Sequence, residues 1–337
     1  MKQQINRFLR HGPAVLMAAA GMMFAAGCST AGAPEKKPVV LAVAWSNTSE
    51  SYSYTSTVMA AGQTDAEVVL LDQIISFDLN YDDQKQLKDQ KEKNGILSSE
   101  AAQLIKANTW HNSNVDEVLE GVDGVIVPGG WDVSPTLYRA EQPWHGIEAD
   151  GDYCAERDVS DYLLVSYCID HDIPIFCICR GMQMLGIVSG AEVIQDIGTY
   201  FADQGITYSN LHRDPERKSF VPHDAMITEP DSLLHQIMKT DLVEKCPSWH
   251  HQALKDVSDT GLMVTAVTGT DGEFMIEAIE LPGHPFCLGV QYHPEVSVRK
   301  VIEQEADADA FMDYETAMKP FYALADACRS VPKKTLP

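Results

Sequence analysis

Four short apolar runs constrain the fold of this chain more than any other feature. They cover residues 39–45, 66–71, 124–130 and 173–178 and are rich in β-branched residues. Runs of this length without polar alternation are typical of strands that are buried on both faces of a sheet. Helical patterns lie between them, most clearly at 155–171. Strands that alternate with helices predict an α/β fold, a three-layer sandwich with a mostly parallel central sheet.

The first 27 residues have the organisation of an export signal. A basic start is followed by an apolar stretch, and small residues then lead to Cys28. This order resembles the lipobox of bacterial lipoproteins, in which the cysteine is lipidated, although Ala25 stands where leucine is more usual. We therefore expect an exported bacterial lipoprotein, held by Cys28 on the periplasmic face or at the cell surface, with residues 28–38 as a tether. An ordinary signal peptide and an uncleaved anchor are the alternatives.

The rest of the chain predicts one domain over residues 39–330. The polar, charged stretch at about 73–115 interrupts the strand and helix rhythm, and we interpret it as a surface insertion containing two short helices. Alternating residues around the Asp271–Gly272 turn predict a hairpin that leads to a further strand. The segment 307–329 predicts a closing helix that is interrupted near Pro320.

Charge and cysteine content exclude some functions. The chain has 49 acidic residues against 25 Lys and Arg, which argues against a nucleic-acid partner because phosphate binding needs a basic surface. Of eight cysteines, seven remain if Cys28 is lipidated. An odd number in an exported protein indicates at least one free thiol. No cysteine or histidine pair has zinc-site spacing, so we predict no metal.

One cysteine stands where a nucleophile would be exposed. The strand at 173–178 ends at Cys179 and a helix follows at once, which predicts a sharp elbow at the carboxyl end of the sheet. Gly181 is the small residue that such an elbow needs. The helix N-terminus favours a thiolate at Cys179, whereas Cys177 points back along the strand and is expected to pack in the core.

The segment GVQYHPE, residues 289–295, offers a base for this thiol. Residues i and i+2 of an extended segment face the same way, so Glu295 could orient His293 while His293 meets Cys179. The glycines at 129–130 and the N–H of Arg180 could donate to a developing oxyanion.

These motifs resemble the class I glutamine amidotransferase-like superfamily, which has a flavodoxin-like fold. The superfamily pattern is carried by ICRGMQML and VQYHPE. A narrower resemblance, to the γ-glutamyl hydrolase branch or peptidase family C26, is carried by GVIVPGGWDVSPTLY, ERD, SWHHQAL and DGEFMIEAIE. This branch includes γ-glutamyl-γ-aminobutyrate hydrolases, and the resemblance covers roughly residues 38–300.

Carried onto the matching positions, the resemblance implies a complete set of site residues. These are Cys179 as nucleophile, His293 as general base and acid, Glu295 as its orienting carboxylate, Gly130 and Arg180 as oxyanion donors, and Gln183 and His250 near the γ-glutamyl group. The chain departs from the family at Cys177, where Gly or Ala is usual, and at Gly190–Ala191, where Gly-Gly is usual.

Several residues keep an ordinary interpretation beside the functional one. His250 and His251 are either substrate contacts or polar residues of a surface turn, and His223 is more typical of a strand start than of a ligand. Arg157 and Asp158 are either a surface pair of little energetic weight or a structural pair at the floor of the site.

The resemblance implies a cysteine hydrolase that cleaves γ-glutamyl amides through a thioester, needs no cofactor and acts on a small-molecule substrate. One alternative is a glutaminase subunit that delivers ammonia to a partner synthase, although the sequence has no Walker A or dinucleotide fingerprint. The other is a non-catalytic γ-glutamyl-binding lipoprotein. Export favours γ-glutamyl peptides outside the cytoplasm over intracellular polyamine conjugates.

Overall fold

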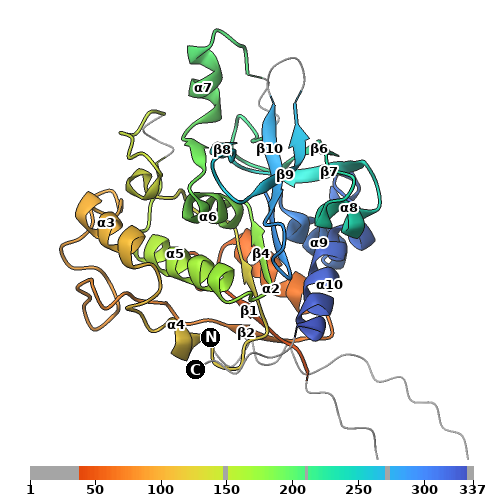
Figure 1. The fold of residues 1–337 in the computed structure, drawn as a ribbon. Coiled ribbons are helices and arrows are strands. Elements are labelled where there is room, and N and C mark those ends of the chain that lie inside the picture. The colour runs from red at the N-terminus through yellow and green to blue at the C-terminus, as the bar shows by residue number, and fades with distance from the viewer. Residues whose placement is uncertain (1–37, 147–150, 209–211, 270–273, 332–337) are drawn as a thin grey trace, which may run out of the picture. The chain divides into compact units, whose positions relative to one another are not determined.

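A nine-stranded sheet forms the centre of the computed structural model, which describes residues 38–146, 151–208, 212–269 and 274–331 (Figure 1). Five adjacent strands of this sheet are parallel, in the order β2 (Glu67–Leu70), β1 (Val40–Val43), β3 (Gly124–Val127), β4 (Ile175–Ile178) and β11 (Cys287–Val290). The four predicted apolar runs form four of these strands. The expected α/β fold is thereby confirmed, while the predicted signal segment, Cys28 and the tether up to residue 37 lie outside the described residues.

Four antiparallel strands extend the sheet beyond β11. They are β10 (Met275–Glu280), β9 (Met263–Thr268), β6 (Val221–Ile227) and β7 (Leu242–Ser248). Strands β9 and β10 form the expected hairpin, whose Asp271–Gly272 turn falls outside the described residues. A separate two-stranded sheet pairs β5 (Glu192–Ile194) with β8 (Ala253–Asp256).

Helices cover both faces of the parallel strands and complete three layers (Figure 1). One layer contains α3 (Ser99–Asn108), α4 (Val115–Val118), α5 (Ala155–Asp170) and α6 (Arg180–Ser189). The other contains α2 (Tyr52–Ala61), α8 (Leu233–Met238), α9 (Pro294–Ile302) and α10 (Tyr314–Ser330). Helix α7 (Ile197–Asp203) follows β5, and single 3-10 turns occur at Pro135–Leu137 and Ala308–Ala310. No helix among the described residues has the length and apolar character needed to cross a bilayer.

Strand β4 is apolar throughout because both of its faces are buried. Ile175 and Cys177 belong to the core beneath α5 and α6, whereas Phe176 and Ile178 belong to the core beneath α9 and α10. All four side chains are fully buried. Because successive strand residues face opposite layers, neither face of the strand leaves a polar position. The expected packing role of Cys177 is confirmed by this burial.

The segment 73–115 differs from expectation in its local structure. It contains one helix, α3, and only the start of α4, while residues 81–97 form turns and the isolated bridges Tyr81–Leu87 and Lys91–Leu97. Leu87 and Leu97 are buried in the core beneath α5. The apolar residues that anchor this polar segment are widely spaced and do not follow a helical period. The prediction of a second helix within the segment is therefore wrong.

The C-terminal helix α10 continues through Pro320, so the predicted interruption is wrong. Proline lacks the N–H for one intrahelical hydrogen bond, but Phe321, Leu324 and Cys328 on the same helix are buried against the sheet layer. Their burial outweighs the loss of one bond. The helix starts only at Tyr314, where the side chain of Asp313 accepts a hydrogen bond from the Thr316 N–H.

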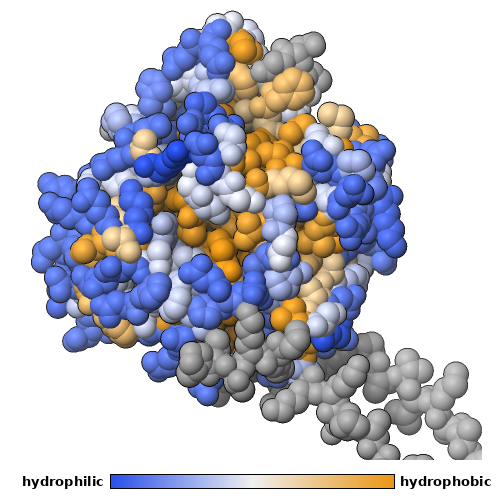
Figure 2. Space-filling view, in the orientation of Figure 1, coloured by the Kyte–Doolittle hydropathy of each residue, from blue (hydrophilic) through white to orange (hydrophobic). Residues whose placement is uncertain are grey.

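One face of the molecule is hydrophilic at its edge and hydrophobic towards its middle. In Figure 2 hydrophilic residues cover most of the periphery of the face shown, and hydrophobic residues gather towards its middle. The exposed apolar side chains include Phe274, Met226 and Leu242, which lie on the antiparallel part of the sheet or at its end.

Candidate active site

The turn between β4 and α6 places Cys179 at the carboxyl edge of the parallel strands. Its backbone has φ 50° and ψ −108°, a conformation that residues other than glycine rarely adopt. The conformation is held by the Cys179 N–H, which donates to the Val290 carbonyl on β11 across 2.7 Å, and by α6, which begins at the next residue. The elbow predicted from the sequence is therefore present, and it is strained.

Gly181 allows α6 to start close to the sheet. A Cβ atom at this position would lie 2.3 Å from the Val127 carbonyl oxygen at the end of β3. Because that contact is with rigid backbone, any larger residue would push the helix, and Cys179 with it, away from β3. Position 181 therefore requires glycine because of the close approach of the Val127 backbone.

His293 lies between Cys179 and Glu295. Its Nδ1 atom is 2.7 Å from Glu295 Oε1, and its ring and Cys179 both border Gly129, where an added Cβ atom would lie 2.8 Å from His293 Cε1 and 3.4 Å from Cys179 Cβ. All three side chains are buried. The extended segment expected here is wrong in detail: His293 caps α9 and Glu295 lies in its first turn, because Pro294 starts the helix at once.

Electrostatics favour a charged His293. Burial opposes protonation of the ring, but the Glu295 carboxylate and Cys179 outweigh it and raise the pKa of His293 to about 10. An imidazolium beside a cysteine is the partner that a thiolate nucleophile needs.

Ser53, in the first turn of α2, is a member of this site that the sequence did not indicate. Its Oγ atom donates to Glu295 Oε1 across 2.9 Å and lies 3.3 Å from His293 Nδ1. The hydroxyl-rich start of α2 is the only local signal, and nothing in it points to a distant histidine. Sequence spacing could not have found this contact.

Arg157 fixes the glycine turn after β3. Its Nη2 atom donates to the carbonyls of Pro128 and Gly129, both across 2.9 Å. Because the C=O and N–H of a trans peptide point in opposite directions, the Gly130 N–H is directed away from Arg157. A Cβ atom on Gly130 would lie 1.8 Å from Arg157 Nη1, so the clamp requires glycine.

Two arginines and two aspartates form a buried chain of ion pairs under this turn. Arg180 Nη2 lies 2.5 Å from Asp158 Oδ1, and Arg180 also pairs with Asp161, which accepts a 3.3 Å hydrogen bond from Arg157 Nε. All four side chains are almost completely buried. Burial raises the pKa of Asp158 to about 6, although Arg180 opposes the shift. The surface-pair interpretation of Arg157 and Asp158 is therefore wrong.

A cavity of about 280 Å³ opens over Cys179. Both predicted substrate-binding residues, Gln183 and His250, line it. The other lining residues are Gly130, Trp131, Asp132, Asp152, Arg213, Arg217, Trp249, His251 and Gln252. The cavity thus combines cationic, anionic and aromatic side chains next to the cysteine.

His251 is a partly buried member of the cavity wall that pairs with two carboxylates. Its Nε2 atom lies 3.1 Å from Asp132 Oδ1, and its Nδ1 atom lies 3.3 Å from Asp196 Oδ2. Burial opposes its protonation, but these two carboxylates raise its pKa to about 9. A positive His251 therefore holds Asp132 in place at the cavity.

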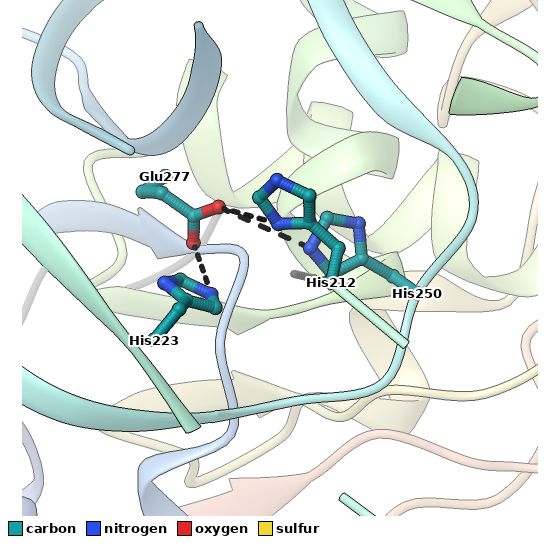
Figure 3. Close-up of side chains that lie close together, drawn as sticks. All are labelled: His212, His223, His250 and Glu277. Atoms are coloured by element: carbon teal, nitrogen blue, oxygen red, sulfur yellow. Dashed lines mark ion pairs between the residues drawn. The ribbon is translucent and has the colours of Figure 1, made fainter. Parts of the chain in front are cut away.

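Four buried residues, one of which lines the cavity, lie close together (Figure 3). They are His212, His223 on β6, His250 and Glu277 on β10. Each histidine approaches the Glu277 carboxylate, at 3.4 Å, 3.5 Å and 3.9 Å respectively. His250 is buried, so the surface-turn interpretation is wrong for it, whereas His223 lies near the start of β6 as expected. No short pattern indicated the cluster, because its members come from four separate segments.

The strained elbow cysteine, set beside a histidine and a carboxylate at the edge of parallel strands, defines a class I glutamine amidotransferase-like protein. The Peptidase C26 family model matches residues 81–295. The chain belongs to the peptidase C26 family.

Two curated relatives illustrate the range of this similarity. The chain is 36% identical over 182 residues to protein NtpR of Enterococcus hirae. The matched region covers 53% of this chain and 69% of NtpR. It is 31% identical over 187 residues to the γ-glutamyl-γ-aminobutyrate hydrolase PuuD of Escherichia coli K12. This matched region covers 54% of this chain and 68% of PuuD. These similarities support a hydrolase with γ-glutamyl amide or amidotransferase-like chemistry.

Proposed function

We propose that the protein is a cysteine hydrolase that cleaves γ-glutamyl amide bonds through Cys179, His293 and Glu295. The observation that carries this proposal is that the strained elbow Cys179 and the His293 ring both lie against Gly129, where an added Cβ atom would contact each of them. A nucleophile needs a base within hydrogen-bond reach and a third group that orients the base. Glu295, 2.7 Å from His293, is that group.

In the proposed first step, Cys179 Sγ attacks the γ-carbonyl carbon and the carbonyl oxygen becomes an oxyanion. The N–H groups of Gly130 and Arg180 would stabilise this charge, and Arg157 holds the peptide that carries the first of them. His293 then donates a proton to the departing amine, which leaves a γ-glutamyl thioester. Water activated by His293 hydrolyses the thioester and releases glutamate.

The charged groups of the cavity suit the end of a γ-glutamyl substrate. A γ-linked glutamate carries a free α-carboxylate and a free α-ammonium. Arg213 and Arg217 on the cavity wall match the carboxylate, and Asp132 and Asp152 match the ammonium. With His251 holding Asp132, this wall would select a zwitterionic substrate over a simple amide.

A substrate panel tests the proposal. The protein without residues 1–28 would be incubated with γ-glutamyl dipeptides, γ-glutamyl-γ-aminobutyrate, a γ-glutamyl polyamine and glutamine, with free glutamate and released amine both measured. We expect equimolar glutamate and amine, and no product with Cys179→Ala. Turnover of glutamine alone would favour the glutaminase interpretation, and binding without turnover would favour a non-catalytic binding protein.

A further inference from the structure

We propose that His212, His223, His250 and Glu277 form a binding site for one divalent transition-metal ion of the zinc type. Each of these residues offers one ligand atom, and the four atoms lie within 4.8 Å of one another. In Figure 3 the three rings are gathered around the Glu277 carboxylate. The four residues are 6% exposed or less, so the site is enclosed by protein.

The hydrogen bonds of two rings fix which nitrogen is available. His250 Nδ1 lies 2.8 Å from the Gln252 carbonyl, and His223 Nδ1 lies 3.3 Å from the Asp224 carbonyl. A carbonyl oxygen only accepts hydrogen bonds, so each Nδ1 carries the proton and, in the neutral ring, each Nε2 presents a lone pair. These lone pairs face Glu277.

A cation at the centre of this arrangement would satisfy all of its members. His223 Nε2 lies 3.5 Å from Glu277 Oε2, and His250 Nε2 lies 3.9 Å from Oε1. Neither carboxylate oxygen receives a hydrogen bond from any described residue. Lone pairs that face a buried anion repel it, and an anion without a partner is costly to bury. One bound metal ion would convert all of these contacts into ligand bonds.

The closest distances in the cluster suit a small four-coordinate ion, and the longer ones would have to shorten on binding. Zinc binds nitrogen and oxygen at about 2.0–2.2 Å, which separates neighbouring ligands of a tetrahedral site by about 3.4 Å. The closest nitrogen–oxygen pair, His212 Nδ1 and Glu277 Oε1, is 3.4 Å apart. Imidazoles that donate their second N–H to a carbonyl are the usual outer support of such a site. Three imidazoles favour zinc and its neighbours over Mg²⁺ or Ca²⁺.

The ion would hold one wall of the substrate cavity. His250 lines that cavity together with Cys179 and Gln183. The Gln252 carbonyl contacts His250 Nδ1 and also accepts a 3.0 Å hydrogen bond from Gln183 Nε2. An ion that fixes the His250 ring therefore also fixes the segment behind Gln183. The proposed role is positional, and no reaction step passes through the metal.

The metal content of the protein tests the proposal without reference to activity. The full chain, as processed by the producing cell and without a polyhistidine tag, would be purified, stripped with a strong chelator and titrated with ZnCl₂ against a chromophoric chelator. We expect about one zinc ion per chain and a higher unfolding temperature for the loaded protein. Co²⁺ in place of zinc should give the visible absorption of a four-coordinate site.

Matched variants locate the ion. Glu277→Gln and His223→Gln should lose at least tenfold in zinc affinity, whereas His111→Gln, on an exposed turn far from the cluster in the sequence, should keep the wild-type stoichiometry. Circular dichroism would confirm that each variant is folded. A stripped wild-type protein that takes up no zinc or cobalt would overturn the proposal, and would show that protons alone satisfy the four residues. So would binding that is unchanged in both folded cluster variants.

Discussion

Ser53 donates a 2.9 Å hydrogen bond to Glu295, and the same Oε1 atom lies 2.7 Å from His293 Nδ1. One carboxylate oxygen therefore joins α2 to the segment that carries the proposed base. Glu295 reaches His293 from within the first turn of a helix. A second contact that limits its rotation is consequently part of how the histidine is oriented.

Removing this hydroxyl should impair turnover more than binding. We expect Ser53→Ala to lower kcat by about tenfold, the effect of one lost hydrogen bond to a charged group, with little change in KM. Ser51→Ala at the N-cap of the same helix is the control, since the Ser51 hydroxyl accepts a hydrogen bond from the Tyr54 N–H. It should lower stability and leave kcat intact. Equal kcat losses in both variants would indicate a structural role for Ser53.

The two cysteines of the CxC sequence should behave differently. Cys177→Ala removes a fully buried thiol that packs beneath α5 and α6, so we expect a loss of about 1 kcal/mol in unfolding free energy and nearly normal kcat/KM. Cys179→Ala should abolish glutamate release and leave the fold intact. Kinetics and urea unfolding of both variants check this. Activity lost only in the Cys177 variant would contradict the assignment.

The pH dependence of the reaction should reflect the raised pKa of His293. Burial opposes its protonation, yet Glu295 and Cys179 raise the pKa to about 10. The imidazolium therefore persists through neutral pH and is lost as the pH approaches 10, well above the ordinary value of about 6.5. We expect kcat/KM to decline only in that alkaline range. Glu295→Gln should move the alkaline limb down by about one pH unit or more, and superimposable profiles would refute the electrostatic role of Glu295.

Asp161 should be important for stability although it lies outside the cavity wall. Asp161→Asn leaves two buried arginines with a weakened partner, and breaking such a buried pair costs about 3–5 kcal/mol. Urea-induced unfolding would measure the loss. Asp259→Asn, which disrupts the exposed pair with Arg139, is the matched control and should change stability little. Similar effects of the two substitutions would argue against a stabilising network.

The lipobox hypothesis has its own test in bacterial cells. If Cys28 is the lipidated residue, Cys28→Ala should abolish labelling by a radioactive or clickable fatty acid and release the protein from the membrane fraction. Cys154→Ala, which changes a partly buried cysteine of the folded domain, should still be labelled. Labelling that persists in the Cys28 variant would show that the anchor lies elsewhere.

Local patterns predicted much of this molecule. The apolar strands and the elbow at Cys179 could be recognised because burial on both faces and a strand-to-helix turn each impose a pattern within a few residues. The relation between His293 and Glu295 was expected, but on an extended segment, since the start of α9 at Pro294 was not recognised.

Features that depend on the assembled chain were not predictable. Ser53 meets Glu295 only because α2 packs on α9. The cluster around Glu277 brings together a turn, two strands and a loop, and no short spacing marks it. Pro320 remains inside α10 because tertiary packing outweighs a local preference.

Asp161 accepts hydrogen bonds from both Arg157 and Arg180 at one oxygen, Oδ2. Arg157 holds the peptide of Gly130, and Arg180 supplies the backbone N–H that follows Cys179. The two proposed oxyanion donors, which follow strands β3 and β4, are thus both held by side chains that meet at one buried oxygen. The distance between these two N–H groups is set by buried side chains that do not contact the substrate. It therefore does not depend on which substrate the cavity wall selects.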